Sequence, residues 1–314
     1  MKSLSRALAA LIHRLTGRFV RDGKSNRAAR KNGPRSGQRA SARKYRPVFG
    51  GSDGFLEDRM TPAVAGQLAL IGSSLVYAGG NNSNAIQIST PAVGQITITD
   101  LTGTITTTVA GFTGSGTNSV TGPIPVNAFT VILNGNGGFD TITTSNAALN
   151  LPRNVQFLAE AITLNNVINT TGAVSGSSVT LGGNVSVALG APAALISTAT
   201  AAGGSFSVTG TFSTPNALTV NTGTNGNVTF SNNLTVSGGA LSVTGCNLSF
   251  RTTQVSGGAV TLSASNAVTL NDNFNASGTI AISANTDNVG GQGFSQTAGN
   301  LSTSSTASPA IKIG

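Results

Sequence analysis

Residues Ser237 to Leu270 read SGGALSVTGCNLSFRTTQVSGGAVTLSASNAVTL and contain one phrase twice. SGGALSV begins at Ser237, and SGGAVTL begins at Ser256, nineteen residues later. Alternate residues of a β-strand face opposite sides, so each apolar–polar–apolar triplet predicts a strand with two inward side chains and one outward Ser or Thr. A phrase that returns at this interval predicts a stack of similar turns.

The interval continues along the second half of the chain. Val228, Leu248 and Val268 begin similar triplets twenty residues apart. Further sets at nearly the same interval are Leu241, Val260 and Ile280; Leu234, Val255, Phe274 and Phe294; and the pairs Val208–Val228, Ile142–Ile162 and Val131–Leu151. We therefore predict an all-β fold, a right-handed parallel β-helix with three short strands per coil and about nine coils.

An antiparallel β-sandwich is the alternative fold. In that fold, turn residues recur about every 8–12 residues, because consecutive strands are joined by hairpins. The steady interval between equivalent triplets favours the β-helix.

Charge divides the chain into zones. Residues 1–60 hold fifteen Lys and Arg against four acidic residues, a net charge of +11, and residues 61–314 hold three against five, a net charge of −2. We expect a basic, largely disordered arm over residues 1–60, a β-rich cap or irregular first coils over residues 64–127, and the β-helix over residues 128–314, truncated at its C-terminus.

A short motif closes the arm, where residues 54–63 read GFLEDRMTPA. It resembles the LEDR-x-TP phrase that ends the basic arm of exported surface proteins of planctomycete bacteria, and the resemblance implies a leader handled by export machinery. The repeats are similar to filamentous-haemagglutinin-like and autotransporter passenger domains. The matching leader residues are Leu56, Glu57, Asp58, Arg59, Thr61 and Pro62.

Asp140 and Glu160 are the candidate catalytic pair. They lie twenty residues apart, each two before an isoleucine, so the repeat places them on neighbouring coils. Two carboxyl groups about 5 Å apart are typical of retaining glycosidases, and Phe139 and Phe157 are the nearby aromatics for a sugar. The alternative is a pair of solvated acids at coil corners.

Two glycine-rich segments have features of calcium-binding nonapeptide repeats. Residues 135–142 read GNGGFDTI and residues 79–86 read GGNNSNAI. Asp140 is the one acid between them, and they stand over fifty residues apart, so a Gly-rich turn before a strand is the competing interpretation. We expect no cofactor, with calcium at Asp140 as a weak candidate.

Several other functions and features require residues or patterns that this sequence does not contain. His13 is the one histidine and sits in the arm, so no serine outside the arm has a histidine base beside it. Cys246, the one cysteine, excludes an internal disulfide. The aromatics of the arm are too sparse for a nucleic-acid stacking platform, and no apolar run is long enough for a membrane-spanning helix.

These features predict a secreted or cell-surface, adhesin-like structural protein that is not an enzyme. Its outward Ser, Thr and Asn side chains suit polysaccharide, cell-surface or matrix components, and we expect no nucleic-acid partner. A carbohydrate-active β-helix enzyme using Asp140 and Glu160, and a weak calcium-binding repeat protein, are the alternatives.

Overall fold

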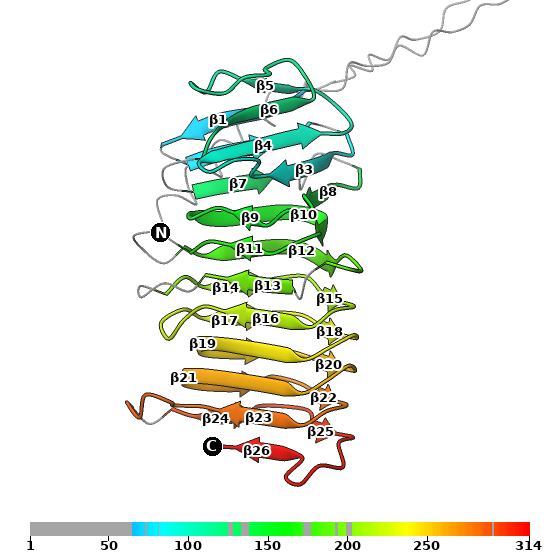
Figure 1. Cartoon of the computed structure of the whole chain (residues 1–314), viewed down its shortest axis with the longest axis vertical. Helices are drawn as coiled ribbons and strands as arrows, with labels where there is room; N and C mark the ends of the chain where they lie inside the picture. The colour runs from blue at the N-terminus through cyan, green and yellow to red at the C-terminus, as the bar shows by residue number, and fades with distance from the viewer. Residues whose placement is uncertain are drawn as a thin grey trace, which may run out of the picture. The chain divides into compact units, whose positions relative to one another are not determined.

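The structure, a computed structural model, describes residues 65–314 apart from 73, 81, 125–127, 133–137, 172–176, 192–193, 199–202 and 291. The basic arm and its LEDR-x-TP motif lie outside these residues. The described part contains no helix, so it includes none that crosses a membrane. About 54% of the described residues are in strands, and they form a parallel β-helix whose turns are stacked along the long axis in Figure 1.

Each turn contributes a strand to each of three faces, and each face is a parallel ladder. Face 1 contains β2 (Ser74–Ala78), β7 (Ala128–Ile132), the first part of β10 (Asn154–Leu164), the first part of β12 (Val179–Val187), β14 (Phe206–Val208), β17 (Val228–Phe230), the last parts of β19 (Leu241–Phe250) and β21 (Val260–Leu270), and β24 (Phe294–Gln296).

Face 2 follows face 1 along the chain in every turn. It contains β3 (Ala85–Ser89), β8 (Thr141–Thr144), the last parts of β10 and β12, β15 (Phe212–Thr214), β18 (Leu234–Val236), β20 (Thr253–Val255), β22 (Phe274–Ala276) and β25 (Leu301–Thr303).

Face 3 completes the turn. It contains β9 (Leu149–Asn150), β11 (Ile168–Asn169), β13 (Ala194–Ser197), β16 (Leu218–Asn221), the first parts of β19 and β21, β23 (Ile280–Ser283) and β26 (Ile311–Ile313). The long strands bend around a corner: β10 and β12 join face 1 to face 2, and β19 and β21 join face 3 to face 1.

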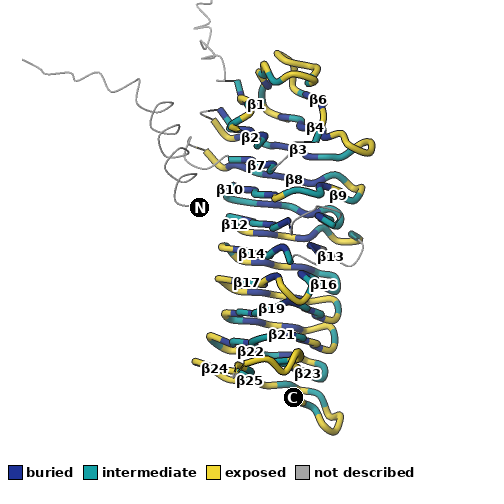
Figure 2. Tube along the Cα trace, turned by 90° about the vertical axis from the view of Figure 1, so that its left-hand side faces the viewer, coloured by how far each residue is buried: buried dark blue, intermediate teal, exposed yellow. Residues whose placement is uncertain are grey.

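The core is a column of inward side chains from all three faces, which Figure 2 shows as the dark segments of the stacked turns. Phenylalanines form a continuous stack within it. The ring centroid of Phe230 lies 5.5 Å from that of Phe206 and 5.6 Å from that of Phe250, and Phe250 lies 5.8 Å from Phe274. Such spacing is favourable for aromatic pairs and fixes each turn against the next.

The repeated SGGA phrase has a steric reason. Gly257 sits above the previous copy of the phrase, and a Cβ built on it would lie 2.2 Å from the backbone nitrogen of Gly239. A Cβ on Gly278 would likewise lie 2.5 Å from the carbonyl oxygen of Gly258. Backbone therefore packs directly on backbone at this corner, which only glycine permits.

The predicted register is confirmed where the interval is regular. Val228, Leu248 and Val268 lie opposite one another in successive turns, as do Leu241, Val260 and Ile280. Ile142 also lies opposite Ile162.

The predicted set Leu234, Val255, Phe274 and Phe294 is wrong by two residues in its first two steps and by a whole face in its third. Leu234 lies opposite Thr253, while Val255 lies opposite Val236. Phe294 belongs to face 1, opposite Val268. Loops of unequal length between the strands cause these errors.

Two further register predictions fail for the same reason. Val228 lies opposite Phe206 and not Val208, and Val131 lies opposite Phe157 and not Leu151. The spacing of paired residues is 27 between Val179 and Phe206 and 31 between Ile280 and Ile311, so several turns contain more than twenty residues.

Antiparallel strands cover the first end of the stack. β1 (Gly66–Ile71) pairs antiparallel with β2 as a hairpin that turns at Gly72, where φ is 65°. β4 (Gln95–Asp100) pairs antiparallel with β3 and with β6 (Ser119–Pro123), while β5 (Ile105–Thr107) pairs in parallel with β1. The cap therefore covers the backbone edges of the first strands of faces 1 and 2, β2 and β3.

Candidate functional site

The outer surface of face 2 carries one column of uncharged polar side chains. Strand pairing places one such residue above another in successive turns, at the inter-strand spacing of about 4.8 Å. Most of these residues are exposed, and all of them carry a hydroxyl or an amide. The column comprises Gln87, Thr143, Thr163, Ser186, Ser213, Thr235, Gln254, Asn275 and Ser302.

Faces 1 and 3 carry similar columns. The column on face 1 is half-buried for most of its length, and the one on face 3 ends at Lys312. Their members are Gln156, Thr180, Ser207, Thr229, Ser249, Thr269 and Ser295 on face 1, and Thr219, Ser242, Thr261, Ala281 and Lys312 on face 3.

An asparagine ladder holds the corner where β19 and β21 bend. The amide nitrogen of Asn247 donates to Oδ1 of Asn227 at 2.9 Å, and that of Asn266 donates to Oδ1 of Asn247 at 2.7 Å. The half-buried Cys246 lies beside this ladder, with its sulfur 3.5 Å from the Asn247 amide nitrogen. These asparagines stabilise the stack, since their polar groups bond to one another.

Asp140 and Glu160 lie on neighbouring turns, because β8 pairs with β10. The backbone N–H of Asp140 donates to Oε2 of Glu160 at 2.9 Å. The Asp140 side chain is 1% exposed and accepts a hydrogen bond from the backbone N–H of Asn84 at 2.7 Å, whereas Glu160 is half-buried. A glycosidase needs both carboxyl groups at the substrate, and here Asp140 is enclosed by the turn above it.

The aromatic residues near this pair point in different directions. Phe157 is fully buried in the core, where its ring centroid lies 6.1 Å from that of Phe129. Phe139 is exposed at the corner beside Asp140. One exposed ring is therefore available for a sugar at this corner, and Phe157 is not.

The two glycine-rich segments are neighbours in space despite their separation in sequence. β3 pairs in parallel with β8 and places Ile86 opposite Ile142. Asn84 and Asp140, each two residues before its isoleucine, therefore occupy the same position of adjacent turns and are both buried. The long insertion of cap strands between β3 and β7 hides this adjacency in the sequence.

A second buried polar contact joins the cap to the first turn. The hydroxyl of Tyr77 donates to Oδ2 of Asp100 at 3.0 Å, and the other Asp100 oxygen accepts from the backbone N–H groups of Thr102 and Gly103. Burial, followed by the Asp100 charge, raises the pKa of Tyr77 above its ordinary value. Nothing in the sequence marked this pair, because Tyr77 lies on β2 of the first turn and Asp100 at the end of β4 in the cap.

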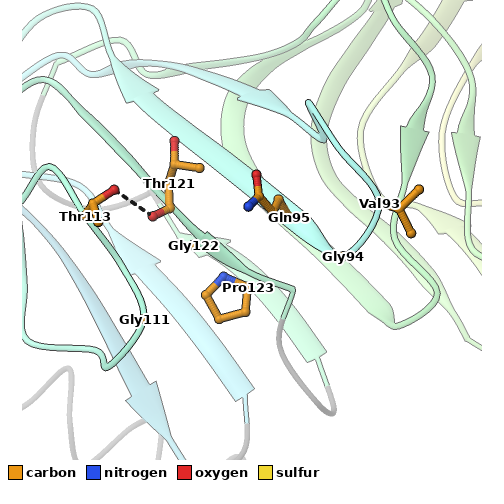
Figure 3. Close-up of a pocket in the computed structure, with 8 residues that line it drawn as sticks. All are labelled: Val93, Gly94, Gln95, Gly111, Thr113, Thr121, Gly122 and Pro123. Carbon is orange, nitrogen blue, oxygen red and sulfur yellow. Dashed lines mark hydrogen bonds between the residues drawn. The ribbon is translucent and has the colours of Figure 1, made fainter.

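The cap also contains a hollow of about 440 Å³, shown in Figure 3. Thr113 and Thr121 lie on one side of it, and the Thr113 hydroxyl donates to the carbonyl oxygen of Thr121 at 3.4 Å. The residues that line it are Val93, Gly94, Gln95, Gly111, Thr113, Thr121, Gly122 and Pro123. None of these side chains titrates, so the hollow offers no acid, base or nucleophilic pair.

Across the described part of the chain, no three His, Cys, Asp or Glu side chains gather where they could hold a metal ion. The predicted leader residues, Leu56 to Pro62, lie outside that part.

No known family model, curated protein or solved structure matches the chain.

Proposed function

We propose that this chain is a structural repeat protein displayed outside the cell, where its uncharged outer faces contact polysaccharide or matrix in the manner of an adhesin. The observation that carries the proposal is the face 2 column, which runs along the stack from Gln87 to Ser302 without a charged side chain.

The chemistry of this column suits a hydroxyl-rich polymer. Hydroxyl and amide groups donate and accept hydrogen bonds, so they pair with sugar hydroxyls in either sense. Their regular spacing allows an extended chain to make repeated weak contacts along the rod, which add up through multivalency. An uncharged surface does not attract phosphates, so this face favours a neutral polysaccharide over nucleic acid.

Export to the cell surface rests on the arm that precedes the rod. Its basic composition and its resemblance to the planctomycete-type leader support a location outside the cell. Fractionation of the native cells, with the full chain followed by a C-terminal epitope tag, tests this part. Recovery in the cytoplasmic fraction alone contradicts it.

The binding part is tested with charge substitutions in matched pairs. We expect the full chain to bind neutral polysaccharides of a panel, and the double variant Ser213→Lys and Thr235→Lys on face 2 to lose that binding at least tenfold. The double variant Ser242→Lys and Thr261→Lys places the same charge on face 3 and serves as the control. Equal binding by both double variants contradicts the role of face 2.

We also propose that the protein is not an enzyme. Its most plausible catalytic pair contains a carboxyl group, that of Asp140, which is buried and already accepts a hydrogen bond from Asn84. The test is a hydrolysis assay on the same panel with Asp140→Asn and Glu160→Gln. Release of sugar by the full chain that both variants lose overturns this proposal.

A further inference from the structure

At the corner that precedes β3 and β8, three oxygen atoms surround one side-chain nitrogen. The side-chain nitrogen of Asn84 lies 3.3 Å from the carbonyl oxygen of Gly80, 2.5 Å from that of Asn82 and 3.0 Å from Oδ1 of Asp140. An amide group has two hydrogens, so these three oxygens share two donors. The nitrogen occupies a small cage of oxygens built from two adjacent turns.

A buried oxygen beside this cage has no partner. Oδ2 of Asp140 is shielded from solvent and accepts no hydrogen bond. Both donors to the Asp140 carboxylate come from Asn84 and bond to the other oxygen, Oδ1. A buried carboxylate oxygen without a donor is costly, because the charge loses its hydration and gains nothing in return.

A second carboxylate lies at this corner. The Glu160 carboxylate accepts a hydrogen bond from the backbone N–H of Asp140, from the turn on the other side. The hydrogen bonds that Asp140 and Glu160 accept here come from neutral N–H groups. A cation at this corner relieves both the unpartnered oxygen and the crowding of oxygens around the Asn84 nitrogen.

We propose that this corner binds a calcium ion between the Asp140 carboxylate and the carbonyl oxygens of Gly80 and Asn82, in the place now taken by the Asn84 side-chain nitrogen. Calcium takes carboxylate, backbone carbonyl and amide oxygens in flexible geometry, whereas magnesium requires a near-ideal octahedron and keeps its waters. The Asn84 amide supplies a further ligand when it turns over and directs Oδ1 at the ion.

The affinity is expected to be low. The cage contains one carboxylate, and turning the Asn84 amide breaks the hydrogen bond that its Oδ1 accepts from the Gly80 N–H at 3.1 Å. Calcium affinity follows the number of charged ligands and the rigidity of the site, and weakly charged sites bind at about 10⁻⁴–10⁻³ M.

The experiment measures the thermal transition of the full chain against calcium chloride at constant ionic strength, after treatment with a chelator. We expect the transition temperature to rise with calcium and to saturate in the millimolar range, with no comparable rise in magnesium. Binding to the folded state alone has this effect. A transition temperature that does not change with calcium, or that rises equally with magnesium, overturns the proposal.

Two substitutions separate this site from general charge effects. Asp140→Asn keeps the shape of the side chain, and we expect it to weaken calcium binding at least tenfold. Asn84→Asp replaces the amide by a second carboxylate, and we expect it to bind calcium at least tenfold more tightly while lowering the transition temperature in chelator. Asp287→Asn, at an exposed loop residue, is the control with the same loss of charge.

The Asn84→Asp variant keeps the test decisive if Asp140→Asn does not fold. Failure of Asn84→Asp to tighten calcium binding, or an unchanged calcium response in a folded Asp140→Asn variant, contradicts the site. Neither readout depends on where the protein is located or on what its outer faces bind.

Discussion

Removal of one ring from the phenylalanine stack is expected to be among the most damaging single changes in the rod. Phe250 is fully buried and lies between two other rings, stacked on Phe230 at an interplanar angle of 14° and edge-on to Phe274 at 88°. Truncation of a buried Phe to Ala costs about 3–5 kcal/mol, and each aromatic pair contributes about 0.5–1.5 kcal/mol beyond its buried area. We therefore expect Phe250→Ala to lower the free energy of unfolding by about 4–5 kcal/mol.

Equilibrium unfolding in urea, followed by far-ultraviolet circular dichroism, measures this loss. Phe250→Leu keeps most of the volume but loses both ring pairs, so it is expected to cost about 1–3 kcal/mol, less than Phe250→Ala. Ser249→Ala, at the outward neighbour in β19, removes a hydroxyl that accepts a hydrogen bond from Asn271 at 3.0 Å and is expected to change the free energy by about 1 kcal/mol at most. A Phe250→Ala variant that loses under about 1 kcal/mol, or a Ser249→Ala variant that loses as much as Phe250→Ala, refutes the inward and outward alternation of β19.

Two further stability predictions follow from close packing and from a buried phenol. Gly257→Ala is expected to destabilise the rod by about 1–3 kcal/mol, since its Cβ meets backbone of the previous turn, whereas Gly293→Ala, with no atom within 4 Å of its Cβ, is expected to be neutral in the same urea titration. Because the pKa of Tyr77 is raised in the folded protein, its contribution is complete below the unfolded pKa of about 10, and stability falls as pH rises beyond it. Tyr77→Phe is expected to remove that part of the alkaline loss between pH 9 and 11, and equal pH profiles for the two proteins contradict this expectation.

The regular part of the fold was predictable from local pattern. Between Val228 and Val268 each turn has twenty residues in total, so the interval in the sequence equals one turn and the register of these residues follows directly. Where corners vary, an error of two residues still assigns a side chain to the correct side, because strand alternation has a period of two. This is why Val208 was predicted correctly as a core residue although its partner in the next turn is Phe230.

The corner that contains Asn84 and Asp140 was harder to recognise. The two residues are 56 positions apart, and the strands between them turn back on themselves as the cap instead of adding regular turns. No interval in the sequence indicates that the chain leaves the stack between these two residues. The contact between Asn84 and Asp140 could therefore be recognised only from the pairing of β3 with β8. The Tyr77–Asp100 contact escaped prediction for the same reason.

Turns of equal length have an evolutionary consequence. The turns that begin at Val228 and Leu248 have the same length and present the same kinds of side chain to the turns before and after them. An in-frame duplication of one such unit places each new residue against a neighbour of the same type and lengthens the molecule by about 4.8 Å. The length of the rod is therefore a property that a lineage can adjust by copying or deleting whole units, without redesign of the interior.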